Sequence, residues 1–152
     1  MNKKRRENKR PEWAAVGGKG DSFARLYKSM LLSPAFQDLT PKQQITLLYC
    51  NVSLWSGPFD ESSGQFYMNK GLWCDTYKLF SSNSNAKFCA CMAALIEHGF
   101  IDCIGNGYST KEKSLYRFST RWKAWGTEAF TLPDNVKTLY MIREEKRQSG
   151  KP

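Results

Sequence analysis

Three stretches of the chain place apolar residues at helical spacing. The first follows the i, i+3, i+4, i+7 pattern with Ile45, Leu48, Tyr49 and Val52. Thr40 and Pro41 precede this stretch as a typical helix start. The pattern therefore predicts a helix over residues 41–54 with those four residues on its apolar side.

A second helix is expected to begin after Asn69, which would cap it. Its apolar side would be formed by Leu72, Trp73, Tyr77 and Phe80. The polar run from Ser81 to Asn85 would end this helix and cap the next one, because serine and asparagine side chains accept hydrogen bonds from the first amides of a helix.

The third helix has the clearest pattern. A single apolar stripe joins Phe88, Cys91, Met92, Leu95 and Ile96. Gly99 follows as the residue that ends the helix in the left-handed conformation. The sequence thus predicts two helices joined by a tight polar turn, which is the helix-turn-helix pattern.

Short strands are predicted on either side of these two helices. Residues 65–68 follow a turn-rich stretch and form the first strand. Residues 100–104 and 115–118 flank a polar, glycine-containing loop, which predicts a β-hairpin. This order of elements is that of a winged helix-turn-helix domain. The expected fold is α+β, mainly α, with a three-helix core, a β-hairpin wing and a C-terminal helix.

The two ends of the chain differ from this central region. Residues 1–21 have no periodic apolar pattern and are predicted to be a disordered basic arm. Residues 22–125 form the predicted domain, which starts with a short helix or an irregular lead-in over residues 23–31. Trp122 and Trp125 are expected to pack the chain back onto the core.

Residues 126–152 are predicted to hold a C-terminal helix and a tail. Pro133 would open the helix, with Val136, Leu139 and Tyr140 on one side, and the charged tail would begin at Arg143.

The formal net charge of +9 is divided unevenly along the chain. Residues 1–21 hold seven lysines and arginines against three acids. Because the arm and the central region are both basic, a polyanion such as nucleic acid is the simplest partner. No apolar run reaches the roughly 20 residues that span a membrane, and the basic start lacks the apolar segment of a secretory signal. We therefore expect a cytoplasmic protein without a membrane partner.

The sequence lacks the motifs and residue spacing that are typical of enzymes and metal sites. The five cysteines lack the spacing of a disulfide framework and are expected to be reduced thiols. The single histidine, His98, directly precedes Gly99 and is expected to end a helix rather than to bind a metal. The sequence has no glycine-rich phosphate loop and no HExxH or GxSxG motif. We expect no enzymatic activity, no metal and no cofactor.

Three groups of residues are candidates for contact with double-stranded DNA. A recognition helix enters the major groove with its N-terminal end, a wing lies beside phosphates, and a basic arm adds salt-sensitive affinity. The recognition-helix group is Ser82, Asn83, Ser84, Asn85 and Lys87; the wing group is Lys111, Lys113, Arg117, Arg121 and Lys123; the arm group is Lys3, Lys4, Arg5, Arg6, Lys9 and Arg10. In the alternative interpretation, the first group only caps the helix, the wing is an ordinary solvated hairpin and the arm only solubilises the chain.

Residues 39–49 and 92–101 carry a resemblance to a known family. The second segment contains Leu-Ile-Glu-His-Gly-Phe-Ile, a common end of the recognition helix in bacterial winged-helix regulators. Together the segments resemble the N-terminal winged-helix domain of plasmid replication initiators of the RepA N-domain family. The resemblance implies origin binding by a dimer, or a regulator carried on a mobile element.

The chain departs from that family on the outward side of the third helix. Family members carry lysines there, whereas this side is expected to present Ala86, Ala90, Ala93, Ala94 and Glu97. The small side chains would let a helix or a phosphate strand approach closely, or they simply favour helix formation.

Two functions follow from these patterns. The first is double-stranded DNA binding by a homodimer, in replication initiation or transcriptional regulation of a plasmid or mobile element. The alternative is a winged-helix adaptor that binds proteins of a replication or conjugation complex.

Overall fold

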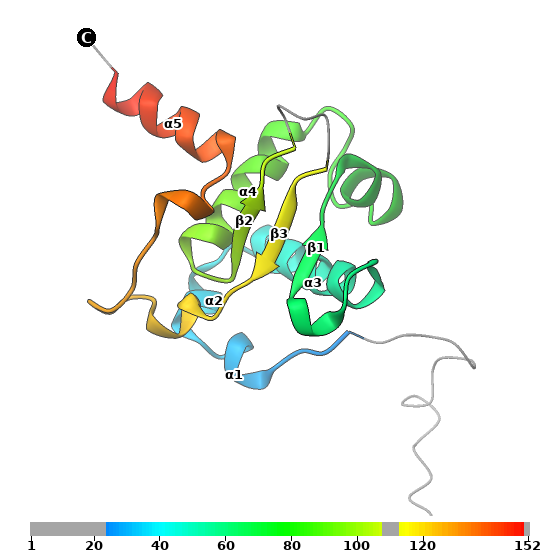
Figure 1. The fold of residues 1–152 in the computed structure, drawn as a ribbon, viewed down its shortest axis with the longest axis horizontal. Helices are drawn as coiled ribbons and strands as arrows, with labels where there is room; N and C mark the ends of the chain where they lie inside the picture. The colour runs from blue at the N-terminus through cyan, green and yellow to red at the C-terminus, as the bar shows by residue number, and fades with distance from the viewer. Residues whose placement is uncertain (1–23, 108–112, 151–152) are drawn as a thin grey trace, which may run out of the picture.

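A computed structural model of the chain describes residues 24–107 and 113–150 (Figure 1). The fold is α+β, with a small antiparallel sheet among helices. The helices and strands are α1 (Lys28–Leu31), α2 (Pro34–Asp38), α3 (Pro41–Ser56), β1 (Gln65–Tyr67), α4 (Asn85–Glu97), β2 (Ile101–Gly105), β3 (Leu115–Phe118) and α5 (Leu139–Ser149). Shorter helical segments are the 3-10 turns η2 (Glu61–Ser63), η4 (Arg121–Ala124) and η5 (Asp134–Val136) and the π-helix η3 (Gly71–Thr76).

The predicted hairpin is confirmed by the pairing of β2 with β3. Cys103 pairs with Tyr116, and Asp102 pairs with Arg117. The first strand is also confirmed and joins the same sheet, because β1 pairs with the free edge of β3 in the order β1-β3-β2. The tip of the hairpin, residues 108–112, lies outside the described residues. Helices α3 and α4 lie against one face of this sheet (Figure 1).

The core lies between the sheet and the helices α3 and α4. Phe66 of β1 is fully buried and stacks on Tyr116 of β3, with ring centroids 5.7 Å apart. Trp73 of η3 stacks on Phe88 of α4 at 4.8 Å. Aromatic pairs of this kind add to the free energy gained by removing apolar surface from water. They fix η3 and β1 against the longer helices.

The predicted helix over residues 41–54 is present as α3, but its core side differs from the prediction. The residues that face the core are Thr46, Leu47, Cys50, Asn51, Ser53 and Leu54. Ile45 is 42% exposed and Val52 is 36% exposed, although both were placed on the apolar side. The helix carries apolar residues on two sides. The i, i+3, i+4, i+7 pattern identified the side that includes the exposed Ile45 and Val52, whereas the core side is the other one.

The second predicted helix is shorter than expected. It is the six-residue π-helix η3, its N-cap is Lys70 without a side-chain hydrogen bond, and the predicted cap Asn69 contributes only its carbonyl oxygen. Lys78 has a positive φ of 52°, so the chain leaves helical geometry before Phe80. Phe80 is buried as predicted, but from a turn rather than from a helix.

The third helix and the residues that end it agree with the prediction. In α4 the predicted stripe is buried, and Gly99 adopts the expected left-handed conformation at φ 82°. His98 is the C-cap. Its Nδ1 lies 2.7 Å from the carbonyl oxygen of Ala94, and its Nε2 lies 2.7 Å from Oδ2 of Asp38. The histidine thus ties the end of α4 to α2.

The C-terminal region is partly as predicted. Trp122 stacks on Phe100 and Trp125 stacks on His98, so both tryptophans pack against the core as expected. The last helix begins later than predicted. Pro133 precedes only the turn η5, whereas α5 starts at Leu139 after Thr138, whose hydroxyl accepts a hydrogen bond from the amide of Met141. Helix α5 also extends through most of the segment predicted to be a charged tail.

The lead-in to the domain is short and exposed. Only Met30 of α1 is buried, and the side chains of Leu26 and Tyr27 are 48% and 62% exposed. Phe23 and the predicted arm lie outside the described residues. Among the helices that the structure describes, none is long and apolar enough to cross a membrane.

The five cysteines carry free thiols whose environments differ. Burial raises the pKa of all five, most strongly that of the fully buried Cys50. Because the thiolate is the reactive form, a thiol reagent at pH 8 should modify the half-buried Cys74 and Cys89 first. Cys50, Cys91 and Cys103 should react only when the chain unfolds. Counting modified thiols by mass spectrometry before and after denaturation tests this, and three or more fast thiols in the folded protein would contradict it.

Candidate nucleic-acid interface

The N-terminal end of α4 is an exposed polar corner of the molecule. Helix α4 begins at Asn85, and Ser82, Asn83 and Asn85 are all exposed. Ser84 occupies the N-cap position but makes no side-chain hydrogen bond to the first turn; its hydroxyl instead lies 2.7 Å from that of Ser81. The predicted capping role is therefore not seen. The first amides of α4 and the polar side chains beside them face outward, where they suit an anion.

Lysines border this corner on one side. Lys87 is exposed in the first turn of α4, and a shallow depression joins it to Ser81, Ser84 and Lys42. The Lys42 ammonium donates a hydrogen bond to the carbonyl oxygen of Leu79 and lies 4.6 Å from the centroid of the Phe80 ring. Lys42 thus holds the turn before α4 while its charge remains close to the helix end.

A groove borders the same corner on the other side. It has a volume of about 510 Å³ and lies between α4, the β2–β3 hairpin and α5. Asn85 of α4, Lys113 of the hairpin and Lys70 before η3 all line it. The structure therefore brings Asn85 and Lys113, two residues predicted from sequence, to one groove. Lys111 of the same hairpin lies outside the described residues.

Lys42 and Lys70 are absent from the predicted set. Each stands at the start of another helical segment, Lys42 in the first turn of α3 and Lys70 before η3. Neither position carries a motif in sequence. Only the packing of α3 and η3 against α4 places both charges beside the recognition-helix group.

The predicted alanine side of α4 is corrected by the structure. Ala93 and Ala94 are buried, at 6% and 8% exposure, and belong to the core. Ala86, Ala90 and Glu97 are exposed as expected. Helix α4 is covered on more sides than an isolated helix-turn-helix would be, since both the sheet and α5 pack against it. Its exposed surface is a narrow strip beside Lys87.

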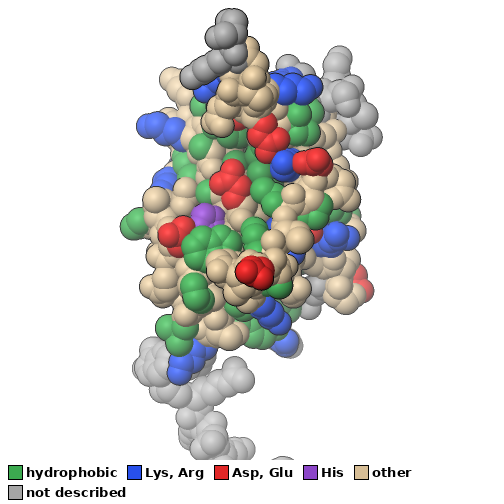
Figure 2. Space-filling view, turned by 90° about the vertical axis from the view of Figure 1, so that its left-hand side faces the viewer, with side chains coloured by type: hydrophobic (Ala, Val, Ile, Leu, Met, Phe, Trp, Pro, Cys, Tyr) green, Lys and Arg blue, Asp and Glu red, His purple; other side chains and the backbone are tan. Residues whose placement is uncertain are grey.

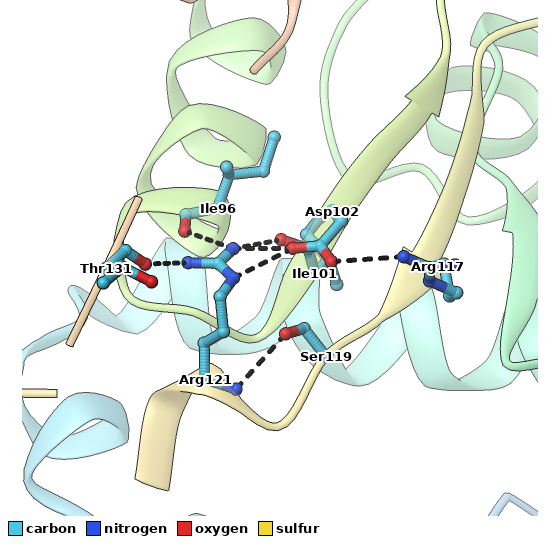
Figure 3. Close-up of polar contacts among 7 residues, drawn as sticks. All are labelled: Ile96, Ile101, Asp102, Arg117, Ser119, Arg121 and Thr131. Atoms are coloured by element: carbon cyan, nitrogen blue, oxygen red, sulfur yellow. Dashed lines mark hydrogen bonds and ion pairs between the residues drawn. The ribbon is translucent and has the colours of Figure 1, made fainter. Parts of the chain in front are cut away.

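Arg121 was predicted to contact DNA, but its guanidinium makes its hydrogen bonds within the protein and has a structural role. Its Nη2 donates to Oδ1 of Asp102 at 2.6 Å and its Nε donates to the same oxygen at 3.2 Å (Figure 3). The guanidinium also donates to the carbonyl oxygens of Ile96, Ile101 and Thr131. With its donors turned toward the protein, Arg121 joins the end of α4, the start of β2 and the chain after η4.

Arg117 shares the same carboxylate but remains more open. Its Nη2 lies 3.7 Å from Oδ2 of Asp102, and its side chain is 49% exposed, against 17% for Arg121. Arg117 stands in the middle of β3, on the sheet face opposite the buried Tyr116. Its charge is partly balanced by Asp102, so it is a weaker candidate for a phosphate than Lys113.

Lys123 lies at the wrong end of the sheet to act with the recognition-helix group. Strand β3 runs from Leu115, near the hairpin tip, to Phe118, and η4 follows it beyond the opposite end. The Lys123 ammonium lies 5.7 Å from the centroid of the Trp122 ring. The predicted wing group is thus divided between the two ends of the sheet.

One face of the molecule is unsuited to a polyanion. Figure 2 shows acidic side chains along the middle of the face that includes His98, with most basic side chains toward its edges. Lys137 lies between two of the acids, 2.7 Å from Asp134 and 2.8 Å from Glu145. The candidate interface is therefore the end of the molecule formed by the start of α4 and the hairpin.

The comparisons with known proteins give no match. No protein-family model, curated protein or solved structure matches the chain.

Proposed function

We propose that the chain binds double-stranded DNA as a winged helix-turn-helix protein. In this proposal η3 and α4 form the helix-turn-helix, the start of α4 enters the major groove, and the β2–β3 hairpin is the wing. The observation that carries the proposal is the uncapped start of α4, with Ser82, Asn83 and Asn85 exposed. Lysines stand on both sides of it; those within the described part of the chain that line the two depressions beside it are Lys42, Lys70, Lys87 and Lys113.

The side chains at this corner match the chemistry of a DNA groove. An asparagine amide pairs with the N6 and N7 edge of adenine, and a serine hydroxyl donates to a phosphate oxygen. The outward-facing amides of a helix start bind phosphate as well. The lysines would neutralise phosphates on both strands and release counterions, which makes the affinity depend on salt.

The biological role is proposed from the resemblance alone. It is replication initiation or transcriptional control on a plasmid or mobile element, in the cytoplasm, with the basic arm adding affinity for the DNA backbone. A second candidate is an adaptor that binds proteins through the same fold. Glu97 on the exposed strip of α4 and the acidic face in Figure 2 favour it, because both repel DNA.

A charge-reversal pair tests the proposed interface. We expect Lys87→Glu to weaken binding to a mixed-sequence duplex by about tenfold at about 0.1 M salt and to reduce the salt slope by about one. Lys123→Glu is the matched control, since it makes the same charge change at an exposed site at the opposite end of the sheet. It should change the dissociation constant by less than about twofold, because exposed charges beyond a Debye length are screened.

Fluorescence anisotropy titrations at several salt concentrations measure both quantities. Equal weakening by the two variants would mean that net charge alone drives binding. That result would remove the start of α4 from the interface.

A further inference from the structure

A pocket lies at the end of the sheet opposite the hairpin tip, and we call it the lead-in pocket. It has a volume of about 650 Å³, larger than the groove beside α4. The described residues that line it come from the lead-in, the last part of α3, the turn η2 with Gly64, and the chain from the end of β3 into η4. Figure 1 shows α1 and the end of β3 toward the bottom of the view, away from the hairpin tip. Clefts of this size commonly bind small molecules.

Aromatic rings form much of the wall of the lead-in pocket. These rings belong to Tyr27, Trp55, Phe118 and Trp122. The buried Asn51 fixes one part of the wall, because its amide donates to the carbonyl oxygen of Arg25 and accepts a hydrogen bond from Nε1 of Trp55 at 3.2 Å. Trp122 is held by stacking on Phe100, with ring centroids 6.0 Å apart. The fold therefore presents apolar rings on which a planar ligand can stack.

Two cations border these rings. The Arg25 guanidinium lies 5.2 Å from the centroid of the Trp55 ring, and the Lys123 ammonium lies 5.7 Å from that of the Trp122 ring. Both cations line the pocket, whereas the described residues that line it include no aspartate or glutamate. The pocket thus combines positive charge with apolar rings, which favours an aromatic ligand that carries negative charge.

We propose that the lead-in pocket binds a nucleoside monophosphate. The base stacks on the aromatic wall, and the phosphate lies between Arg25 and Lys123. A phosphate monoester carries a charge of about −1.5 to −2 at pH 7, which matches two cations better than a single carboxylate does. The guanidinium can donate to two phosphate oxygens at once. The exposed Ser29 and Thr120 also line the pocket, and their hydroxyls suit the ribose.

This site is separate from the proposed DNA interface. None of its described lining residues lines the groove or the depression beside the start of α4. Nucleotide binding is therefore tested without DNA, and its failure leaves the proposed DNA binding untouched.

An NMR titration of the isotope-labelled full chain with adenosine monophosphate tests the proposal. The indole N–H signals of Trp55 and Trp122 should shift together, with a dissociation constant below about 1 mM. The signal of Trp73, which lines the groove beside α4, should not shift. Adenosine and inorganic phosphate each supply only part of the ligand and should bind at least about tenfold more weakly.

Charge-neutralising variants identify the phosphate contacts. Arg25→Gln and Lys123→Gln should each weaken binding of adenosine monophosphate about fivefold or more, because each removes a charge beside the phosphate. Lys28→Gln is the matched control, since Lys28 is exposed in α1 but is not among the residues that line the pocket. At about 0.15 M salt it should change the dissociation constant by less than about twofold.

Each alternative outcome overturns the proposal. Signals of Trp55 and Trp122 that do not move at millimolar nucleotide exclude the site, including the case in which another segment of the chain fills the pocket. A shift of Trp73 instead places the nucleotide in the groove beside α4. Equally tight binding of inorganic phosphate removes the base from the site, and equally tight binding of adenosine removes the phosphate. Equal weakening by Lys28→Gln and Lys123→Gln means that net charge alone attracts the nucleotide.

Discussion

Gly99→Ala should lower the free energy of unfolding by about 3 to 4 kcal/mol, the combined cost of a left-handed residue and a steric clash. Gly99 has φ 82°, which alanine adopts only at a cost. A Cβ atom there would lie 2.5 Å from the amide nitrogen of Trp122 and 2.7 Å from the carbonyl carbon of Arg121. Both are backbone atoms, so the chain after β3 must move away from the end of α4.

Gly126→Ala separates the two costs. Gly126 has nearly the same conformation, with φ 81°, but a Cβ atom there would meet nothing within 4 Å. It should therefore cost only about 1 kcal/mol. Urea denaturation of the two variants and the wild type gives both differences. Equal destabilisation of the two variants would mean that the contact between Gly99 and η4 does not restrain the fold.

Asp102→Ala should destabilise the protein by about 3 kcal/mol, because it leaves the Arg121 guanidinium partly buried without its counterion. The carboxylate is 10% exposed and receives two hydrogen bonds from Arg121 (Figure 3). Arg121 in turn holds the carbonyl oxygens at the end of α4 and the start of β2. Loss of Asp102 therefore loosens the connection between α4 and the β2–β3 hairpin.

Arg117→Ala is the control for the same carboxylate. Its ion pair is longer, at 3.7 Å, and its side chain is half exposed, so its removal should cost less than about 1 kcal/mol. The comparison is made from the midpoints of chemical denaturation, followed by hydrogen exchange at the β2 amides. If Arg117→Ala costs as much as Asp102→Ala, Arg121 is not the main partner of the carboxylate.

The sequence predicted those elements whose signals are local. Gly99 correctly predicted the end of α4, because a glycine in the left-handed conformation commonly ends a helix whatever packs around it. The polar loop between two apolar runs correctly predicted the β2–β3 hairpin. The π-helix η3 was beyond this kind of reasoning, since the apolar residues up to Phe80 fit an ordinary helix equally well. The chain leaves helical geometry at Lys78, which carries no turn signal.

The buried side of α3 shows why periodicity alone falls short. Leu47, Cys50 and Leu54 repeat at the same spacing as Ile45, Leu48 and Val52, so the sequence offers two apolar sides. The core side also contains Thr46, Asn51 and Ser53, polar residues that a pattern search counts as surface. Their hydrogen bonds offset the burial: Thr46 donates to the carbonyl oxygen of Lys42, and Asn51 donates to that of Arg25.

The candidate interface was predictable only in part for a similar reason. The polar run before α4 was visible because it stands next to a strong helix signal. The separate roles of Arg117 and Arg121 were not visible, because they depend on Asp102, whose position opposite Arg117 follows from strand register. The place of Lys123 depends on η4, which follows β3 beyond the far end of the sheet. Lys42 and Lys70 reach the interface through tertiary packing, and no local pattern distinguishes them from other surface lysines.

We propose that the folded domain, and not only the basic arm, binds DNA. The most direct test is fluorescence anisotropy with a mixed-sequence duplex at two salt concentrations. It compares the wild type with a full-length variant in which Lys3, Lys4, Arg5, Arg6, Lys9 and Arg10 are glutamine. If the folded domain binds DNA, the variant should still bind, more weakly, with a clear dependence on salt. Binding that disappears with the arm charges would contradict it, and the start of α4 would then be a surface for proteins rather than for DNA.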